Sequence, residues 1–139
     1  SRGRFCIVDT LSNKQFFPKL SNVRDFEIVD DTVYLVFPEF IAKVALSNLI
    51  STNELSYEKI RDKGGKFIEY NPLYKILYLS ISEGTFTYNL ETHKWNELHL
   101  NNQPIYATQL QNYDSICWIG TLSNGVIGFK KKNKILATQ

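Results

Sequence analysis

The stretch Leu110-Gln111-Asn112-Tyr113-Asp114-Ser115-Ile116-Cys117-Trp118-Ile119-Gly120-Thr121, followed by Asn124-Gly125-Val126-Ile127-Gly128-Phe129, decides the fold of this chain. Short runs rich in β-branched and aromatic residues alternate with turn residues, a pattern that predicts strand, tight turn, strand, second turn and third strand. Asn, Asp and Gly suit these turns because they tolerate left-handed backbone. Weaker copies of the pattern occur upstream, so we expect one small β-sheet unit to be repeated.

The repeat has a period of about 40 residues. Counting back from Gly125, Gly84 lies 41 residues earlier, Phe40 a further 44 and Gly3 a further 37. We call these four residues the anchors of the repeat. A β-rich run begins seven residues before each of the last three anchors, and we expect the copies to be in register there. The residues that open these runs are Val33, Leu77 and Trp118.

Each unit contains at least three predicted strands. The first strands are expected at 26–29, 67–70 and 106–110, and the second at 33–37, 77–81 and 118–122. After each anchor, apolar residues stand two apart, which indicates a third strand with one buried face. A fourth strand is drawn from residues between units, such as 94–98.

A four-stranded unit that repeats at about 40 residues is typical of β-propeller blades. The sequence therefore predicts an all-β fold, a partial β-propeller of about three four-stranded antiparallel blades, with a single β-sandwich as the alternative. Residues 1–139 are expected to form one propeller fragment with approximate repeats at 1–9 (the end of a blade), 16–46, 67–90 and 95–129.

One segment fits both a helix and a strand. Between Phe40 and Leu49, the residues Ile41, Ala45 and Leu49 would share one helical face. Position in the repeat favours a strand through about Leu46. The polar stretch 51–65 is then expected to be a long loop with a helical turn around 54–60.

Composition limits the classes of function. The chain has 139 residues, 43% of them hydrophobic, so it can bury a core. Its 16 basic and 14 acidic residues leave a charge of +2, too little to favour nucleic acid or an anionic membrane. No stretch approaches the roughly 20 apolar residues that cross a bilayer. Since the chain starts at Ser1 and lacks methionine, we interpret it as a piece of a longer protein.

The third unit resembles the repeat of the two-component regulator propeller family. The family pattern is an apolar strand, an Asp/Asn-rich turn, a Trp-aliphatic-Gly-Thr strand and then Asn-Gly before another apolar strand. Trp118, Gly120, Thr121 and Gly125 stand at the matching positions, whereas the two upstream units depart from the pattern. The resemblance implies the extracytoplasmic sensor of a hybrid histidine kinase that responds to glycans, located in the periplasm.

Several groups are candidates for chemical sites, and each has a simpler explanation. His93 and His99 are six residues apart, about 20 Å on an extended strand, too far to share a metal. The carboxylates of Asp30-Asp31 fit a turn. The lysines at 130–132 and 134 fit a hairpin whose edge they blunt. Cys6 and Cys117 lie in apolar runs and are expected to be buried free thiols.

The sequence predicts no catalytic residue, no metal site and no cofactor. Four residues are ligand-binding candidates: Glu39, Glu83, Asn124 and Trp95. The first three stand at equivalent places at one end of successive units and would form a polar ring around a channel, or simply face water. Trp95, between units, would stack on a sugar ring, whereas Trp118 is expected to pack between blades.

The preferred hypothesis is a non-catalytic ligand-sensing propeller fragment, with a glycan as ligand. The alternatives are a propeller-type polysaccharide or lactone lyase and a general protein-interaction scaffold. The expected partners are further blades of the same protein or a second copy of the chain, because about three blades leave sheet faces uncovered. Neither nucleic acid nor membrane contact is expected within this segment.

Overall fold

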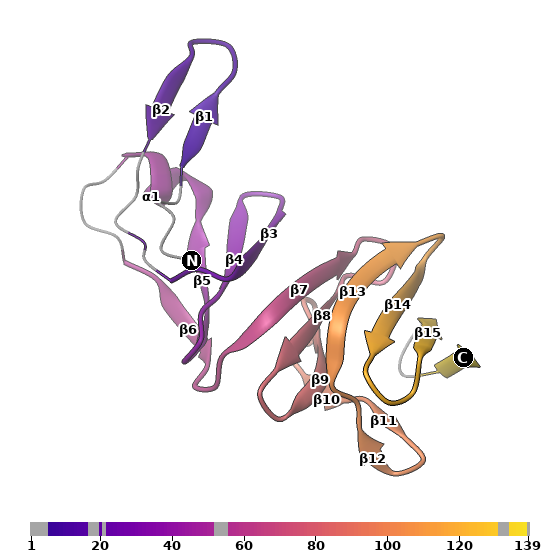
Figure 1. Ribbon diagram of the computed structural model, residues 1–139. Helices are drawn as coiled ribbons and strands as arrows, with labels where there is room; N and C mark the ends of the chain where they lie inside the picture. Colours follow the sequence, from indigo (N-terminus) through magenta and orange to yellow (C-terminus); the bar gives the residue numbers. More distant parts are fainter. Residues whose placement is uncertain (1–5, 17–19, 21, 52–55, 131–133, 139) are drawn as a thin grey trace. The chain divides into compact units, whose positions relative to one another are not determined.

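A computed structural model of the chain describes residues 6–16, 20, 22–51, 56–130 and 134–138. The described residues are nearly all strands and turns, with one short helix among them (Figure 1). Three antiparallel sheets of four strands follow one another, and the strands of each lie in chain order. The predicted all-β fold built from four-stranded antiparallel sheets is therefore confirmed. The chain divides into two compact units, Ser1–Gly64 and Gly65–Gln139.

The first unit contains a hairpin, a four-stranded sheet and the helix. Its elements are β1 (Ile7–Asp9), β2 (Lys14–Phe16), β3 (Asp25–Val29), β4 (Thr32–Val36), β5 (Ile41–Ala45), α1 (Leu46–Ser51) and β6 (Glu58–Arg61). One face of the sheet, with Leu35 and Ala42, is buried against Leu20 and Leu49. Leu49 belongs to α1, so the helix helps to cover this face.

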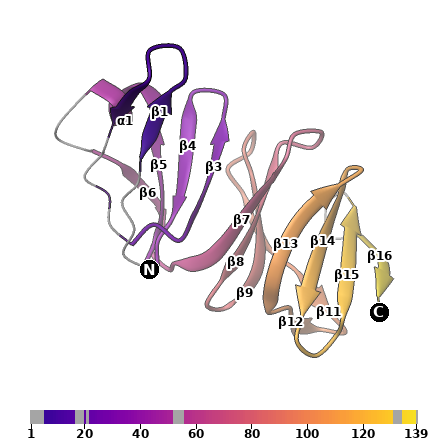
Figure 2. The same ribbon diagram turned by 45° about the horizontal axis from the view of Figure 1, so that its top comes forward.

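The second unit contains two four-stranded sheets and a small hairpin between them (Figure 2). The first sheet has strands β7 (Gly65–Asn71), β8 (Ile76–Ile81), β9 (Gly84–Asn89) and β10 (Trp95–Glu97). The hairpin is β11 (His99–Leu100) with β12 (Gln103–Pro104). The second sheet has β13 (Ala107–Tyr113), β14 (Ile116–Thr121), β15 (Val126–Lys130) and β16 (Lys134–Thr138).

The two sheets of the second unit pack face to face, and their first strands, β7 and β13, lie side by side (Figure 1). A shared core joins Ile76 and Tyr78 of β8 to Ile119 of β14 and Ile127 of β15. The burial of each of these isoleucine side chains contributes roughly 1.5–3 kcal/mol. The apolar strand residues thus hold the unit together by stacking one sheet on the other.

Side-chain hydrogen bonds to backbone carbonyls close both ends of this stack. At one end, Asn71 Nδ2 donates to the carbonyl of Ser115 at 3.2 Å, and Asn112 Nδ2 donates to the carbonyl of Tyr70. Toward the other end, Thr85 Oγ1 donates to the carbonyl of Ile105 at 2.6 Å. Because these groups are partly or fully buried, the bonds satisfy carbonyls that water would otherwise reach poorly.

The register of the repeat differs by one residue from the prediction. Leu35 pairs with Ala42 and Leu79 with Phe86, seven residues on in both cases. Ile119, in contrast, pairs with Ile127, eight residues on. Counting back from Gly125 therefore misplaces the central strand of the third sheet. The residues that share one position are Tyr34, Tyr78 and Trp118, whereas Val33 and Leu77 align with Cys117.

The extra residue lies in the connection between β14 and β15. The backbone N–H and the hydroxyl of Thr121 both donate to the carbonyl of Gly125, at 2.8 and 2.9 Å. The backbone N–H of Asn124 donates in turn to Thr121 Oγ1 at 2.9 Å. Gly125 has φ +67°, a conformation that glycine adopts without steric cost. The loop is closed by its own hydrogen bonds, so its length differs without disturbing the sheet.

The segment 40–49 divides between the two predicted structures. Ile41–Ala45 is strand β5, as the repeat position predicts, and α1 begins directly after it at Leu46. The expected helical turn at 54–60 is wrong where the structure describes it, because Glu58–Arg61 pairs with β5 as strand β6. Residues 52–55 lie outside the described residues, as does Gly3, the first anchor of the repeat.

The two cysteines differ in exposure. Both are free thiols, but only Cys117 is buried, so the prediction is right for Cys117 and wrong for Cys6, which is exposed. Burial, together with the nearby Glu69 carboxylate, raises the pKa of the Cys117 thiol far above its usual range. Cys117 therefore acts as a small apolar core residue.

Candidate functional site

Three of the four candidate binding residues lie in exposed turns between the second and third strands of their sheets. Glu39 lies between β4 and β5, Glu83 between β8 and β9, and Asn124 between β14 and β15. The turns of Glu83 and Asn124 are at the same end of the second unit (Figures 1 and 2). The predicted polar ring around a channel remains a prediction.

The fourth candidate, Trp95, belongs to an aromatic cluster at the outer strand of the first sheet in the second unit. Trp95 pairs with Tyr88 across β10 and β9, and their ring centroids are 4.6 Å apart with planes tilted by 40°. The exposed ring of His93 lies nearly parallel to that of Tyr88, at 6.2 Å. Tyr88 is buried and Trp95 half-buried, so the cluster is a fixed aromatic surface with a partly open edge.

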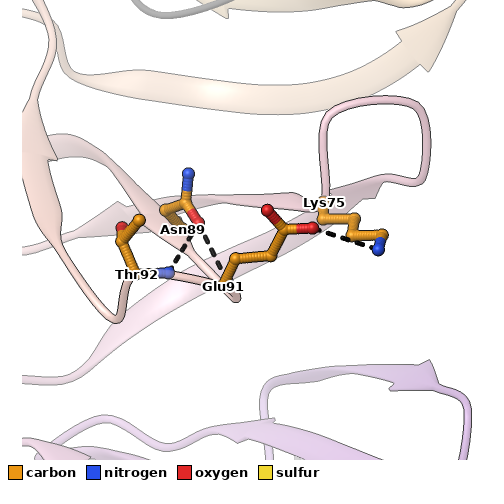
Figure 3. Close-up of polar contacts among 4 residues, drawn as sticks. All are labelled: Lys75, Asn89, Glu91 and Thr92. Carbon is orange, nitrogen blue, oxygen red and sulfur yellow. Dashed lines mark hydrogen bonds and ion pairs between the residues drawn. The ribbon is translucent and has the colours of Figure 1, made fainter.

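The turn beside this cluster is held by the side chain of Asn89 (Figure 3). Asn89 Oδ1 accepts hydrogen bonds from the backbone N–H groups of Glu91 and Thr92, at 2.8 and 3.0 Å. The backbone N–H of His93 donates to the carbonyl of Asn89 at 2.8 Å. His93 itself has φ +58°, in the left-handed region that closes such turns. The turn thus places the imidazole next to Tyr88.

An ion pair borders the same turn. Lys75 Nζ lies 3.0 Å from Glu91 Oε1, and both side chains are largely exposed (Figure 3). Exposed pairs of this kind contribute little to stability, typically 0–1 kcal/mol, because water and salt screen them.

The histidines differ from the prediction in geometry. His93 lies in a turn and β10 begins only at Trp95, so the two histidines do not lie on one extended strand. His99 belongs to the next short strand, β11, and its Nε2 lies 3.4 Å from Oε1 of Glu97, the last residue of β10. Within the described ranges, no three His, Cys, Asp or Glu side chains gather closely enough to hold a metal ion.

The other charged candidates, Asp30 and the lysine cluster, lie at the turns that the sequence predicts. Asp30 has φ +53° in the two-residue turn between β3 and β4. Lys130 ends β15 and Lys134 begins its antiparallel partner β16. Residues 131 and 132, the rest of the lysine cluster, lie outside the described part of the chain.

The first unit carries a shallow hollow of about 310 Å³ that the sequence did not reveal. It lies over β4, β5, α1 and the start of β6, and its lining is mostly polar. The lining residues are Thr32, Lys43, Val44, Ala45, Asn48, Ser56, Tyr57 and Glu58. Two of these lining residues form an ion pair, with Lys43 Nζ 3.7 Å from Glu58 Oε2. This volume lies at the lower end of the roughly 300–1,000 Å³ of small-molecule sites.

Aromatic stacking fixes one side of the hollow. The ring of Tyr57 lies 5.4 Å from that of Phe40, and Phe40 lies 4.4 Å from Phe37. Lys59 Nζ is 4.6 Å from the centre of the Phe40 ring, which adds a cation–π contact. The sequence signal for this hollow is the polar Lys43 between two apolar residues of a strand. Because alternate strand residues point to opposite faces, Lys43 points away from the face that its apolar neighbours bury.

Comparisons with known proteins assign no family. No protein-family model matches the sequence, and no curated protein is significantly similar to it. Across the described residues, we find no helix with the length and apolar character that a membrane span requires.

Proposed function

We propose that this chain is a non-catalytic, ligand-sensing segment of a β-propeller and that its ligand is a glycan. It would belong to the periplasmic part of a bacterial hybrid two-component sensor, as the resemblance of the Trp118 repeat implies. Ligand binding would act by favouring one of two arrangements of the sensor, which requires different affinities for the two and no chemical step.

One observation carries the propeller part of the proposal. Three successive four-stranded antiparallel sheets have an aromatic residue at the same position of the second strand, namely Tyr34, Tyr78 and Trp118. In the second unit two such sheets stack with their first strands adjacent. Radial stacking of four-stranded sheets in chain order is the arrangement of propeller blades.

The aromatic cluster of Trp95, Tyr88 and His93 supports a glycan as the ligand. A sugar ring presents an apolar face to an aromatic ring and hydroxyl groups to polar side chains. The cluster supplies the first, and Lys75 and Glu91 supply charged donors and acceptors beside it. Because Asn89 fixes the turn, little side-chain and backbone entropy is lost on binding.

Calorimetric titration of the chain with a panel of soluble oligosaccharides tests the glycan part. We expect at least one to bind, and Trp95→Ala to weaken it tenfold or more. Two matched variants localise the site. Trp118→Phe changes the other tryptophan and should leave the affinity unchanged. Lys43→Met with Glu58→Gln removes the charges of the hollow and tests the first unit. Loss of affinity only in the hollow variant would move the site to the first unit, and no binding by any sugar would refute the ligand class.

The sensor part has a separate test. The reading frame that contains this segment is expected to encode further repeats of the same kind, a membrane-spanning helix and a histidine kinase. A complete open reading frame without a kinase would refute the two-component assignment, while leaving the glycan titration as an independent result.

A further inference from the structure

One face of the last sheet, which we name the Trp118 face, is largely uncovered. Two of its rows across β13, β14 and β15 are Gln111, Trp118 and Gly128, and Gln109, Gly120 and Val126. Trp118 and Gly120 are only half-buried, and both glutamines and Val126 are exposed. On the opposite face of the same strands, the apolar residues Leu110, Cys117, Ile119, Ile127 and Phe129 are buried against the preceding sheet.

The structure shows what covers the equivalent face one repeat earlier. There Glu69, Tyr78 and Thr87 form the row that corresponds to Gln111, Trp118 and Gly128. Tyr78 is 0% exposed, because it packs on the apolar row Leu110, Ile119 and Ile127 of the following sheet. The same register position is thus a sheet-to-sheet contact where a following sheet is present.

The pairing of large and small residues makes the Trp118 face suited to the same contact. Tyr78 pairs with Thr87, whereas the larger Trp118 pairs with Gly128. A Cβ atom on Gly128 would lie 2.8 Å from Cζ3 of Trp118, so the indole lies flat against the strand. A flat aromatic ring over a glycine keeps the surface level enough for another sheet to stack on it.

Two apolar rows of this chain are already covered within their own compact units, which argues for a partner sheet beyond them. The row of Leu35 and Ala42 is covered by Leu20 and Leu49, and the row of Leu110, Ile119 and Ile127 lies against Tyr78. In a second copy both of these rows would be covered in the same way.

We infer that the Trp118 face is the docking surface for a further four-stranded sheet of the same repeat in the same polypeptide, which would place an aliphatic row on Trp118. This inference rests on the proposed function only in that the chain is a segment of a propeller. It does not depend on the identity of the ligand, and its test uses none.

The test extends the full chain after Gln139 with a second copy of residues 98–139, which begins where β10 ends. Trp95→Phe in the chain and tryptophan-to-phenylalanine in the copy leave Trp118 as the only tryptophan. We expect its emission to move to shorter wavelength and its acrylamide quenching constant to fall at least threefold relative to the unextended W95F chain. As control, Ile119→Asp and Ile127→Asp in the copy alone should restore the original quenching.

Each other outcome overturns the inference. Unchanged quenching in an extended chain whose circular dichroism shows the added strands means that the sheet folds elsewhere. An unfolded copy means the same, because these residues fold against the Tyr78 face in the present chain. Light scattering that finds the unextended chain dimeric, with Trp118 already protected, would assign the face to a second copy.

Discussion

Tyr78 and Trp118 occupy the same position in neighbouring sheets of one compact unit, yet the first is fully buried and the second half-buried. Local sequence alone does not produce this difference, since both residues are aromatic, lie in the second strand and face the same side of their sheet. Burial depends on whether another sheet stacks on that side. The repeat thus determines which residues can be buried. The number of stacked sheets determines which of them are buried in this chain.

The largest test of this comparison truncates the two rings. Tyr78→Ala is expected to lower the free energy of unfolding by about 3–5 kcal/mol, since it leaves a cavity in the packed core. Trp118→Ala should cost about 1 kcal/mol, because water already reaches part of its ring. Urea unfolding of both variants measures the difference. Equal losses would show that the Trp118 face is as well packed as the Tyr78 face.

A pH series separates the two faces of β14 itself. Cys117 precedes Trp118 and points to the buried side, where its pKa is raised mainly by burial and further by Glu69. The unfolded thiol ionises near pH 8.5. Above about this pH, ionisation stabilises the unfolded state, whereas the buried thiol of the folded state stays neutral. The free energy of unfolding should then fall by about 1.4 kcal/mol per pH unit.

Two alanine variants check the origin of this slope. Cys117→Ala should remove it between about pH 8.5 and 10, whereas Cys6→Ala should keep it, because Cys6 is exposed in the folded chain. The comparison concerns slopes, so the packing loss in Cys117→Ala does not affect it. If both variants keep the full slope, another group is responsible.

The strands could be predicted because two independent signals coincide in each unit. Apolar residues alternate along Phe86 and Tyr88 or along Ile127 and Phe129, and turn residues such as Asp30 and Asp114 stand between the runs. The register could not be predicted by counting from glycines, because the loop at Thr121–Gly125 holds one residue more and closes on its own hydrogen bonds. A slip of one residue exchanges the two faces of a strand.

The candidate site was less accessible to prediction. Trp95 was identified as an exposed aromatic, but its contacts with Tyr88 and His93 depend on strand pairing and on a left-handed turn. The hollow near Lys43 depends on α1, which the repeat does not predict, and on β6, which lies in the stretch 51–65 that the sequence predicts to be a loop. Sites formed by residues from several elements need the register before they can be recognised.

The hydroxyl of Tyr78 offers a finer test of its burial. No described residue gives Tyr78 Oη a hydrogen-bond partner, and an unsatisfied buried polar group costs about 1–3 kcal/mol. Tyr78→Phe is therefore expected to raise the free energy of unfolding by about 1 kcal/mol, measured in urea. Tyr113→Phe is the control, because that ring is 72% exposed and its loss of a hydroxyl should change nothing measurable. A destabilised Tyr78→Phe chain would mean that the hydroxyl is hydrogen-bonded in solution.

The smallest effect is expected at the turns that open the two stacked sheets. The β7–β8 turn has four residues with a left-handed Lys75, whereas the β13–β14 turn has two, Asp114 with φ +51° and Ser115 with φ +64°. Two positive φ values define a type I′ turn, which favours Asp-Gly. Ser115→Gly should thus stabilise the chain by about 0.5 kcal/mol, the relief of left-handed strain less the added entropy of an unfolded glycine.

This substitution keeps the hydrogen bond between the two turns, because Asn71 Nδ2 donates to the backbone carbonyl of Ser115. Ser115→Ala is the matched control: it also removes the hydroxyl but retains Cβ, so it should give no gain. Thermal unfolding of the three chains measures the effect as a shift of about 2–4 °C in Tm for the glycine variant. A lower Tm for Ser115→Gly than for Ser115→Ala would show that the added entropy of the unfolded glycine outweighs the relief of backbone strain at this turn.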